Sequence, residues 1–230
     1  MKITWLGQAG LLFETGGKTI IVDPYLSDSV EKIEPHNKRR VPVAKQFLRI
    51  QPDIILLTHN HLDHTDPETL CHYLRDDSKV VVLASYNAWQ TARKFGGLKN
   101  NYVMFDRKTR WTEGDLVFEA VYAAHSDDHA VDILLHAEGK VWYITGDTLY
   151  NEQIFADLPD KVDYVFLPVN GRGNNMNMAD AQAFCERLGA VAIPMHCGLF
   201  DDYDLHQFGY ANKIVLEFYQ EILCKGGKGL

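Results

Sequence analysis

Four separate apolar segments of the chain each end in a histidine or an aspartate. They read "DIILLTH", "FEAVYAAH", "KVWYITGD" and "AVAIPMH", and they end at His59, His125, Asp147 and His196. Short apolar runs bounded by polar residues are typical of buried strands. Side chains at the ends of neighbouring strands converge when those ends lie along one edge of a fold. The four segments therefore predict a fold with several adjacent strands and one shared polar site.

The first segment continues into "HNHLDH", residues 59–64. Side chains alternate across an extended backbone, so His59, His61 and Asp63 share one side, and the adjacent His64 is aimed elsewhere where the chain bends. Imidazole nitrogen and carboxylate oxygen suit zinc, manganese or iron. We expect His59 and His61 at one metal ion, and Asp63 and His64 at a second.

Two aspartates near these segments each have a structural and a functional interpretation. Asp147 either binds metal or caps a helix that begins near Thr148. Asp23 of "IVDPY" either supports the site or forms a turn before Pro24. Three of the ten histidines have no partner residues in the pattern, and we assign them no function: His36, His72 and His136.

The order of the remaining elements predicts two sheets packed face to face with helices outside, within one domain of residues 1–230. Strands separated by Gly-containing turns open the chain, and strand-then-helix pairs follow. Asp66 and Pro67 mark one helix start, and Asn177 and Gly189 delimit another helix. We also predict a long helix at 204–224, because its apolar residues recur at helical spacing: Leu205, Phe208, Val215, Phe218 and Ile222.

Composition bounds the class of partner. The net charge of −8 disfavours nucleic acid and anionic membranes, and leaves a small molecule as the expected partner. The basic run at 38–40 is either a local anion site or a solvated loop. Four scattered cysteines, an N-terminus without a signal-peptide pattern, and the lack of an apolar run of ~20 residues predict a cytoplasmic protein with reduced thiols. The sequence leaves room for a homo-oligomer.

Four motifs occur in the order "THNHLDH", "AAHSDD", "TGDT" and "IPMHCG". In this combination the chain resembles the metallo-β-lactamase superfamily over nearly its whole length. The resemblance implies an α+β fold, a four-layer αββα sandwich with metals at the edge of the two sheets. The segments "WLGQAGLLFE", "LPVNGRGNNMNMADA" and "IPMHCGLFDDY" are similar to the ascorbate-6-phosphate lactonase-like branch. That lactonase is longer and lacks a plain histidine like His125 at the third motif.

The resemblance also implies how two divalent metal ions, zinc or manganese with iron as an alternative, would be held. The first would bind His59, His61 and His125, and the second would bind Asp63, His64 and His196. Asp147 would bridge them, and Asp23 would orient a ligand histidine from behind. Glutamate stands at the position of His61 in the oxygen-reducing di-iron members, so the resemblance disfavours a redox role.

These expectations converge on a metal-dependent hydrolase. Two ions would lower the pKa of a shared water, and Asp63 would orient the resulting hydroxide and accept its proton. The loop "VNGRGNNMN" offers Asn170 and Arg172 to a small anionic substrate, with a sugar-phosphate lactone as the favoured one. For this loop, the alternative is an ordinary glycine loop without a ligand. For the function of the chain, two alternatives remain: a phosphodiesterase of the N-acyl-phosphatidylethanolamine phospholipase D-like branch, and a non-catalytic metal-binding member. Residues 126–129 stay unassigned.

Overall fold

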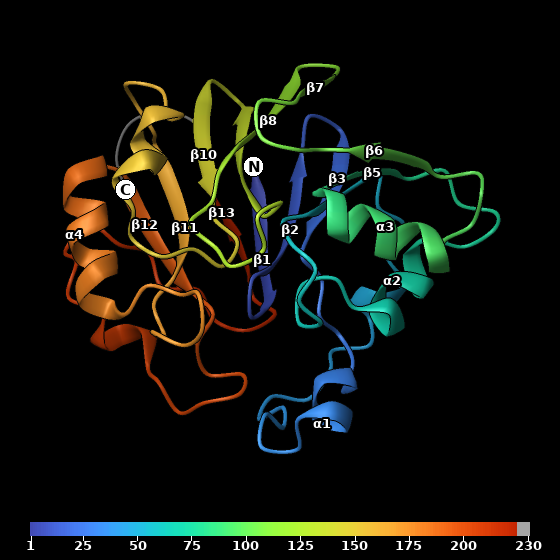
Figure 1. Ribbon diagram of the computed structural model, residues 1–230, viewed down its shortest axis with the longest axis horizontal. Coiled ribbons are helices and arrows are strands. Elements are labelled where there is room, and N and C mark those ends of the chain that lie inside the picture. Colours follow the sequence, from blue (N-terminus) through green and yellow to red (C-terminus); the bar gives the residue numbers. More distant parts are fainter. Residues whose placement is uncertain (225–230) are drawn as a thin grey trace.

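The computed structural model describes residues 1–224, which form two mixed sheets (Figure 1). The seven-stranded sheet has the order β13-β1-β2-β3-β4-β5-β6 and the six-stranded sheet the order β12-β11-β10-β9-β8-β7. The first sheet comprises β1 (Lys2–Gly7), β2 (Gly10–Thr15), β3 (Lys18–Val22), β4 (Ile54–Leu57), β5 (Val81–Ala84), β6 (Asn101–Met104) and β13 (Glu221–Leu223). The second comprises β7 (Arg110–Glu113), β8 (Leu116–Tyr122), β9 (Val131–Ala137), β10 (Lys140–Ile144), β11 (Tyr164–Pro168) and β12 (Val191–Met195).

Side chains along the strands of the first sheet point alternately into two hydrophobic cores, one on each face of the sheet. In β4, Ile54 and Leu56 lie in the core between the sheets, whereas Ile55 and Leu57 face the helices. This is the period of two that an extended chain imposes, applied to a strand that is buried on both faces. The rings of Phe13 on β2 and Phe166 on β11 meet edge to face at 5.5 Å. The inner core therefore joins the two sheets directly.

Helices form the outer layers, as predicted. Helices α2 (Pro67–Tyr73) and α3 (Tyr86–Phe95) cover the first sheet, and α4 (Met178–Leu188) lies beside β11 of the second (Figure 1). The Asp66 carboxylate caps α2 and the Asn177 side chain caps α4, while Gly189 ends α4 in the left-handed region at φ 72°. The αββα sandwich is thus confirmed. Strand β6 was not identified in the sequence.

The predicted helix at 204–224 is wrong. The chain there forms one short turn, η3 (Leu205–Gln207), then irregular backbone, then β13, which pairs antiparallel with β1. Its apolar residues reach the core from an extended path: Phe218 stacks on Trp5 with ring centroids 4.2 Å apart. Backbone pairing along β1 and these contacts outweigh the helical spacing, which Gly209 already interrupts. The tail from Lys225 onward lies outside the described residues.

The polar segment 27–46, between β3 and β4, carries α1 (Ser29–Ile33), which projects beyond one end of the sheets (Figure 1). Its basic run is not an anion site at Arg39, because that guanidinium is buried and donates to the carbonyl of Tyr25 and to the hydroxyl of Tyr219. The short turn η1 (Phe47–Arg49) follows it, and η2 (Glu152–Ala156) lies after β10. The cysteines of the described part of the chain are free thiols. None of the helices in residues 1–224 is long and apolar enough to cross a membrane.

Candidate metal centre

The strand ends that the sequence singled out meet at one edge of the sandwich. His59 follows β4 of the first sheet, and His125, Asp147 and His196 follow β8, β10 and β12 of the second. The backbone bends sharply at this edge, since His196 itself takes the left-handed region at φ 66°. The two sheets therefore contribute side chains to one site.

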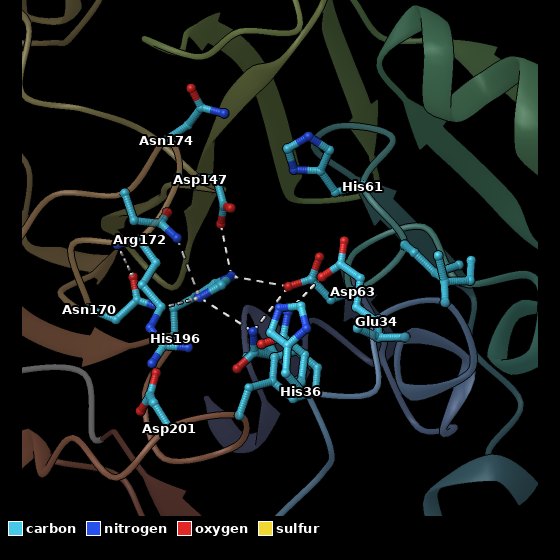
Figure 2. A pocket seen from close by; sticks show the side chains of 18 residues that line it. Glu34, His36, His61, Asp63, Asp147, Asn170, Arg172, Asn174, His196 and Asp201 are labelled. Carbon is cyan, nitrogen blue, oxygen red and sulfur yellow. Dashed lines mark hydrogen bonds and ion pairs between the residues drawn. The ribbon is translucent and has the colours of Figure 1, made fainter.

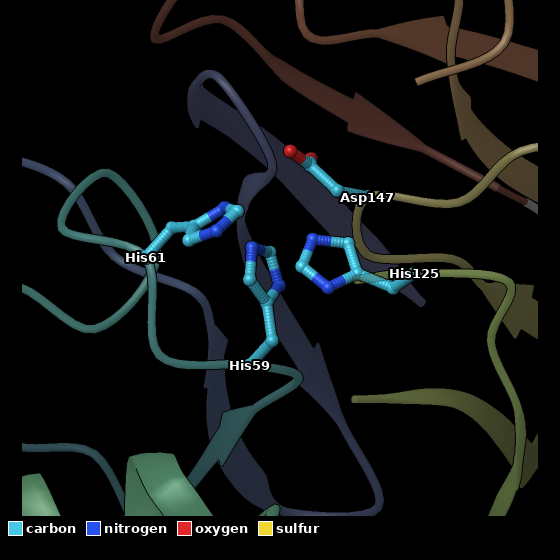
Figure 3. Close-up of side chains that lie close together, drawn as sticks. All are labelled: His59, His61, His125 and Asp147. Atoms are coloured by element: carbon cyan, nitrogen blue, oxygen red, sulfur yellow. The ribbon is translucent and has the colours of Figure 1, made fainter. Parts of the chain in front are cut away.

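One group of four side chains contains His59, His61, His125 and Asp147. One donor atom from each lies within 4.8 Å of the others. Figure 3 shows the two histidines from the β4 end facing His125 and Asp147 from the other sheet. Ring centroids of His59 and His125 are 4.4 Å apart.

A second group contains Asp63, His64 and His196. The Nε2 atoms of His64 and His196 lie 3.2 Å apart, and Oδ1 of Asp147 lies 3.0 Å from the first and 2.9 Å from the second. Figure 2 shows His196 and Asp63 facing each other across the floor of a cleft, with Asp147 beside them. Asp147 thus touches both groups, where the bridging role was expected. It caps no helix in the described chain, since the next one, η2, is capped by Asn151.

A buried row of side chains supports the histidines from behind. Asp23 accepts hydrogen bonds from the backbone N–H and the hydroxyl of Thr58 at 2.8 and 2.5 Å, and its Oδ2 lies 2.9 Å from Nδ1 of His64. Asp23 therefore lies behind His64 and contacts its ring, and it does more than form the turn before Pro24. Gly146 leaves room for this row, because a Cβ there would lie 2.4 Å from the Thr58 hydroxyl.

These contacts determine which nitrogen of two histidines is bare. Asp23 accepts the Nδ1–H of His64, so a neutral His64 carries its lone pair on Nε2. The Thr58 hydroxyl gives its proton to Asp23 and can accept from Nδ1 of His59 at 3.1 Å. Nε2 of His59 is then also bare, and it is buried without a partner in residues 1–224. Buried lone pairs that converge without hydrogen-bond donors fit a cation.

The pKa values of the site separate the two groups of histidines. Burial, with the charge of His64, lowers the pKa of His59 well below its usual range, and burial lowers that of His125 to about 4. Both rings are therefore neutral, as a ligand must be. Burial opposes the charge of Asp147, but His196 and His64 hold its pKa well below the usual range. Burial likewise opposes the charge of His64, but Asp147 and Asp63 raise its pKa well above the usual range.

Both ring nitrogens of His125 have partners that lie outside the two groups. Its Nδ1 accepts from the backbone N–H of Asp127 at 2.9 Å, and its Nε2 lies 3.2 Å from the Asn174 amide. Ligation by His125 therefore requires it to release one of them. Asn174 also donates to Ser126 at 2.9 Å, which ties the loop of residues 170–177 to the segment after β8.

A cleft of about 530 Å³ opens above the second group. Its polar wall includes Asn170 and Arg172 from the predicted substrate loop. Arg172 is exposed, and its guanidinium lies 5.9 Å from the Tyr203 ring. Asn170 is buried, with its Oδ1 accepting from the Arg172 backbone and its Nδ2 3.2 Å from Nδ1 of His196. A separate, more open hollow on the other side of His61 is lined by residues 126–129.

Comparison of the chain with known proteins identifies its family. Residues 2–196 match the family described as a beta-lactamase superfamily domain. The chain belongs to the metallo-β-lactamase superfamily. Within the superfamily it belongs to the UPF0173 metal-dependent hydrolase family. It is 30% identical over 212 residues to the member from Geobacillus thermodenitrificans, an alignment that covers 87% of each chain.

Solved structures of the superfamily share its fold. Igni18, a metallo hydrolase from Ignicoccus hospitalis, superposes with a TM-score of 0.72 at 20% identity, over 96% of this chain and 97% of its own. The metallo-beta-lactamase fold protein YhfI from Bacillus subtilis gives 0.71 at 15% identity, over 96% and 98%. At these identities the likeness shows the fold alone.

Some residues of this metallo-β-lactamase site were given no role from the sequence. Gln8 sits in the left-handed region at φ 48° and donates through Nε2 to Oδ2 of Asp63 at 3.0 Å. His36, to which we assigned no function, lines the cleft together with Glu34. A glutamine in a strand turn and a histidine in a polar loop are common in any protein. Only the fold brings them to the site.

Proposed function

We propose that the chain is a hydrolase with a binuclear metal centre that acts on a small anionic substrate, with a sugar-phosphate lactone as the favoured one. The observation that carries the proposal is the convergence of the buried Nε2 atoms of His64 and His196 on Oδ1 of Asp147, in whose other group Nε2 of His59 has no hydrogen-bond partner within residues 1–224. His59, His61 and His125 would hold one ion, Asp63, His64 and His196 the other, and Asp147 both. Bound divalent ions supply water activation and stabilise negative charge on a reacting oxygen.

The residues of the chain have separate tasks in this proposal. Asp63 is partly exposed in the cleft and is fixed by the Gln8 amide, so it can accept a proton from the attacking water. Asp23 and Thr58 keep His64 and His59 in the tautomers that present Nε2. Arg172 places a permanent positive charge on the cleft wall, where it can bind a phosphate or carboxylate.

A panel of substrates tests the proposal. Protein reconstituted with zinc or with manganese is assayed against phosphorylated and unphosphorylated lactones, phosphodiesters and thioesters. We expect turnover of the phosphorylated lactone, with Arg172→Met raising its KM and leaving the unphosphorylated lactone unaffected. Purified protein that binds no divalent ion after reconstitution would rule out a metal-dependent hydrolase.

A second candidate, a phosphodiesterase for a substrate with an apolar arm, is favoured by one wall of the cleft. That wall is formed by apolar side chains, of which Ile33 on α1 is 72% exposed: Val30, Ile33, Leu62 and Phe200. The same panel separates the candidates, because this one predicts faster cleavage of phosphodiesters as the apolar arm lengthens. Ile33→Ser is then expected to reduce that gain without changing the turnover of lactones.

A further inference from the structure

The ring of His196 lies between two different surroundings. Its Nε2 faces Asp147 at 2.9 Å and His64 at 3.2 Å, inside the second ligand group. Its Nδ1 points away from that group, toward side-chain amides. Figure 2 shows the ring between the carboxylates and Asn170. The amides lie 3.2, 3.4 and 3.5 Å from Nδ1 and belong to Asn170, Gln8 and Asn175, respectively.

An oxygen acceptor is needed on the Nδ1 side. A histidine that binds metal through Nε2 carries its remaining proton on Nδ1, and that N–H is usually paired with an oxygen. His64 meets the carboxylate of Asp23 in this way, and His59 meets the hydroxyl of Thr58. His196 meets the NH₂ ends of amides, which are donors. One of the three amides must therefore present its oxygen when His196 binds metal.

Hydrogen bonds to other groups fix the orientation of two of the three amides. Nε2 of Gln8 donates to Asp63, and turning this amide would set its oxygen against a carboxylate. Oδ1 of Asn170 accepts from the backbone N–H of Arg172, and turning it would break that bond. Oδ1 of Asn175 is buried and has no hydrogen-bond partner within residues 1–224. A half-turn of the Asn175 amide breaks no bond made by its oxygen.

We infer that Asn175 is the positioning residue of His196: its Oδ1 accepts the Nδ1–H and so directs Nε2 to the metal of the second group. The inference rests on the proposed function. The backbone around Asn175 is well fixed for this task. Its N–H donates to the Arg172 carbonyl, and the N–H of Met176 donates to the carbonyl of Thr148, one residue after Asp147.

Zinc affinity of the intact chain tests the inference, measured by competition with a chelator of known affinity. Asn175→Leu keeps the size of the side chain and removes the acceptor, whereas Asn175→Asp keeps an oxygen at the same place. We expect the Leu variant to bind the more weakly held zinc about 10- to 100-fold less tightly, the usual effect of losing such a partner. The Asp variant should bind within about threefold of wild type. Asn101→Leu, which makes the same change at an exposed position of β6, is the control.

Each outcome is decisive. A Leu variant that binds zinc like wild type, or an Asp variant that loses as much affinity as Leu, would overturn the role of Asn175. A loss in Asn170→Leu alone would assign the acceptor to Asn170 instead. Melting temperatures of the metal-free variants separate misfolding from lost affinity, and the Asp variant remains informative if the Leu variant is unstable. Wild-type protein that binds neither zinc nor manganese would overturn the proposed function, and this inference with it.

Discussion

Asp23 and His64 are 41 residues apart in the sequence, yet their Oδ2 and Nδ1 atoms lie 2.9 Å apart with both side chains fully buried. The contact links the end of β3 to the histidine-rich turn after β4. Because Asp23 also accepts two hydrogen bonds from Thr58, one carboxylate fixes the orientation of this whole turn.

Asp23→Asn should weaken metal binding without touching a proposed ligand. The amide offers one acceptor to three donors, so Nδ1 of His64 or Thr58 loses its partner. We expect zinc affinity to fall about 10- to 100-fold. Isothermal titration with zinc measures the effect, and Asp28→Asn, which changes an exposed aspartate of the same segment, is the control. Equal affinities for the two variants would show that Asp23 has no part in the site.

Asp147→Asn should abolish tight binding of both ions. The amide keeps the shape of the side chain but loses the charge that offsets two dications. We expect affinity to fall more than about 100-fold, beyond the loss seen for a residue that only supports a ligand. Metal content after gel filtration, together with turnover, measures the loss. Full metal content with full activity would remove Asp147 from the centre and contradict the binuclear site.

Metal affinity should rise with pH. The carboxylates of Asp147 and Asp63 overcome the effect of burial and raise the pKa of His64 in the metal-free protein. His64 therefore keeps its proton at neutral pH, and a metal ion must displace it. Below the raised pKa, the apparent affinity should change about tenfold per pH unit for each proton displaced. Calorimetry in buffers of different ionisation enthalpy counts the protons, and a count of zero would contradict the expectation.

Asp132 should make the stability of the metal-free protein depend on pH. Burial raises the pKa of its carboxyl to about 8, although Tyr143 donates to it at 2.5 Å. The unfolded pKa is about 3.9, so the stabilising contribution is complete below that pH and is lost as the pH rises toward the folded value. We expect Asp132→Asn to gain stability relative to wild type by up to about 1.4 kcal/mol per pH unit between those limits.

Urea unfolding in the presence of a chelator, at several pH values, measures the Asp132 effect. Asp115→Asn changes an exposed aspartate and is the control. Its stability should run parallel to that of wild type across the range. If the Asp132→Asn curve is parallel as well, the buried carboxyl does not take up a proton on folding.

The histidines and strand ends could be predicted because their chemistry is local. Apolar runs that end in His59, Asp147 or His196 show both the strand and the residue at its end. Helices α2 and α4 could be predicted because their caps lie within a few residues of the helical pattern. In each case neighbours in sequence carry the signal.

The missed features depend on contacts between distant segments. The path of 204–224 is set by β1 and by Trp5, about two hundred residues earlier, so spacing alone suggested a helix. Gln8 reaches Asp63 because its backbone adopts a positive φ at a strand turn, which no side-chain pattern reveals. Asn175 is one of several asparagines in its loop, and only its buried, unpaired oxygen distinguishes it within the described chain.

The division of the proposed ligands between the two sheets has a consequence for biogenesis. His59, His61, Asp63 and His64 follow β4, whereas His125, Asp147 and His196 follow strands of the other sheet. A nascent chain that has emerged only as far as β6 therefore holds an incomplete donor set for either ion. In the proposed centre, both donor sets would be complete only once His196 has been synthesised and the second sheet has docked on the first. Tight metal binding would then occur only after the two sheets have packed together.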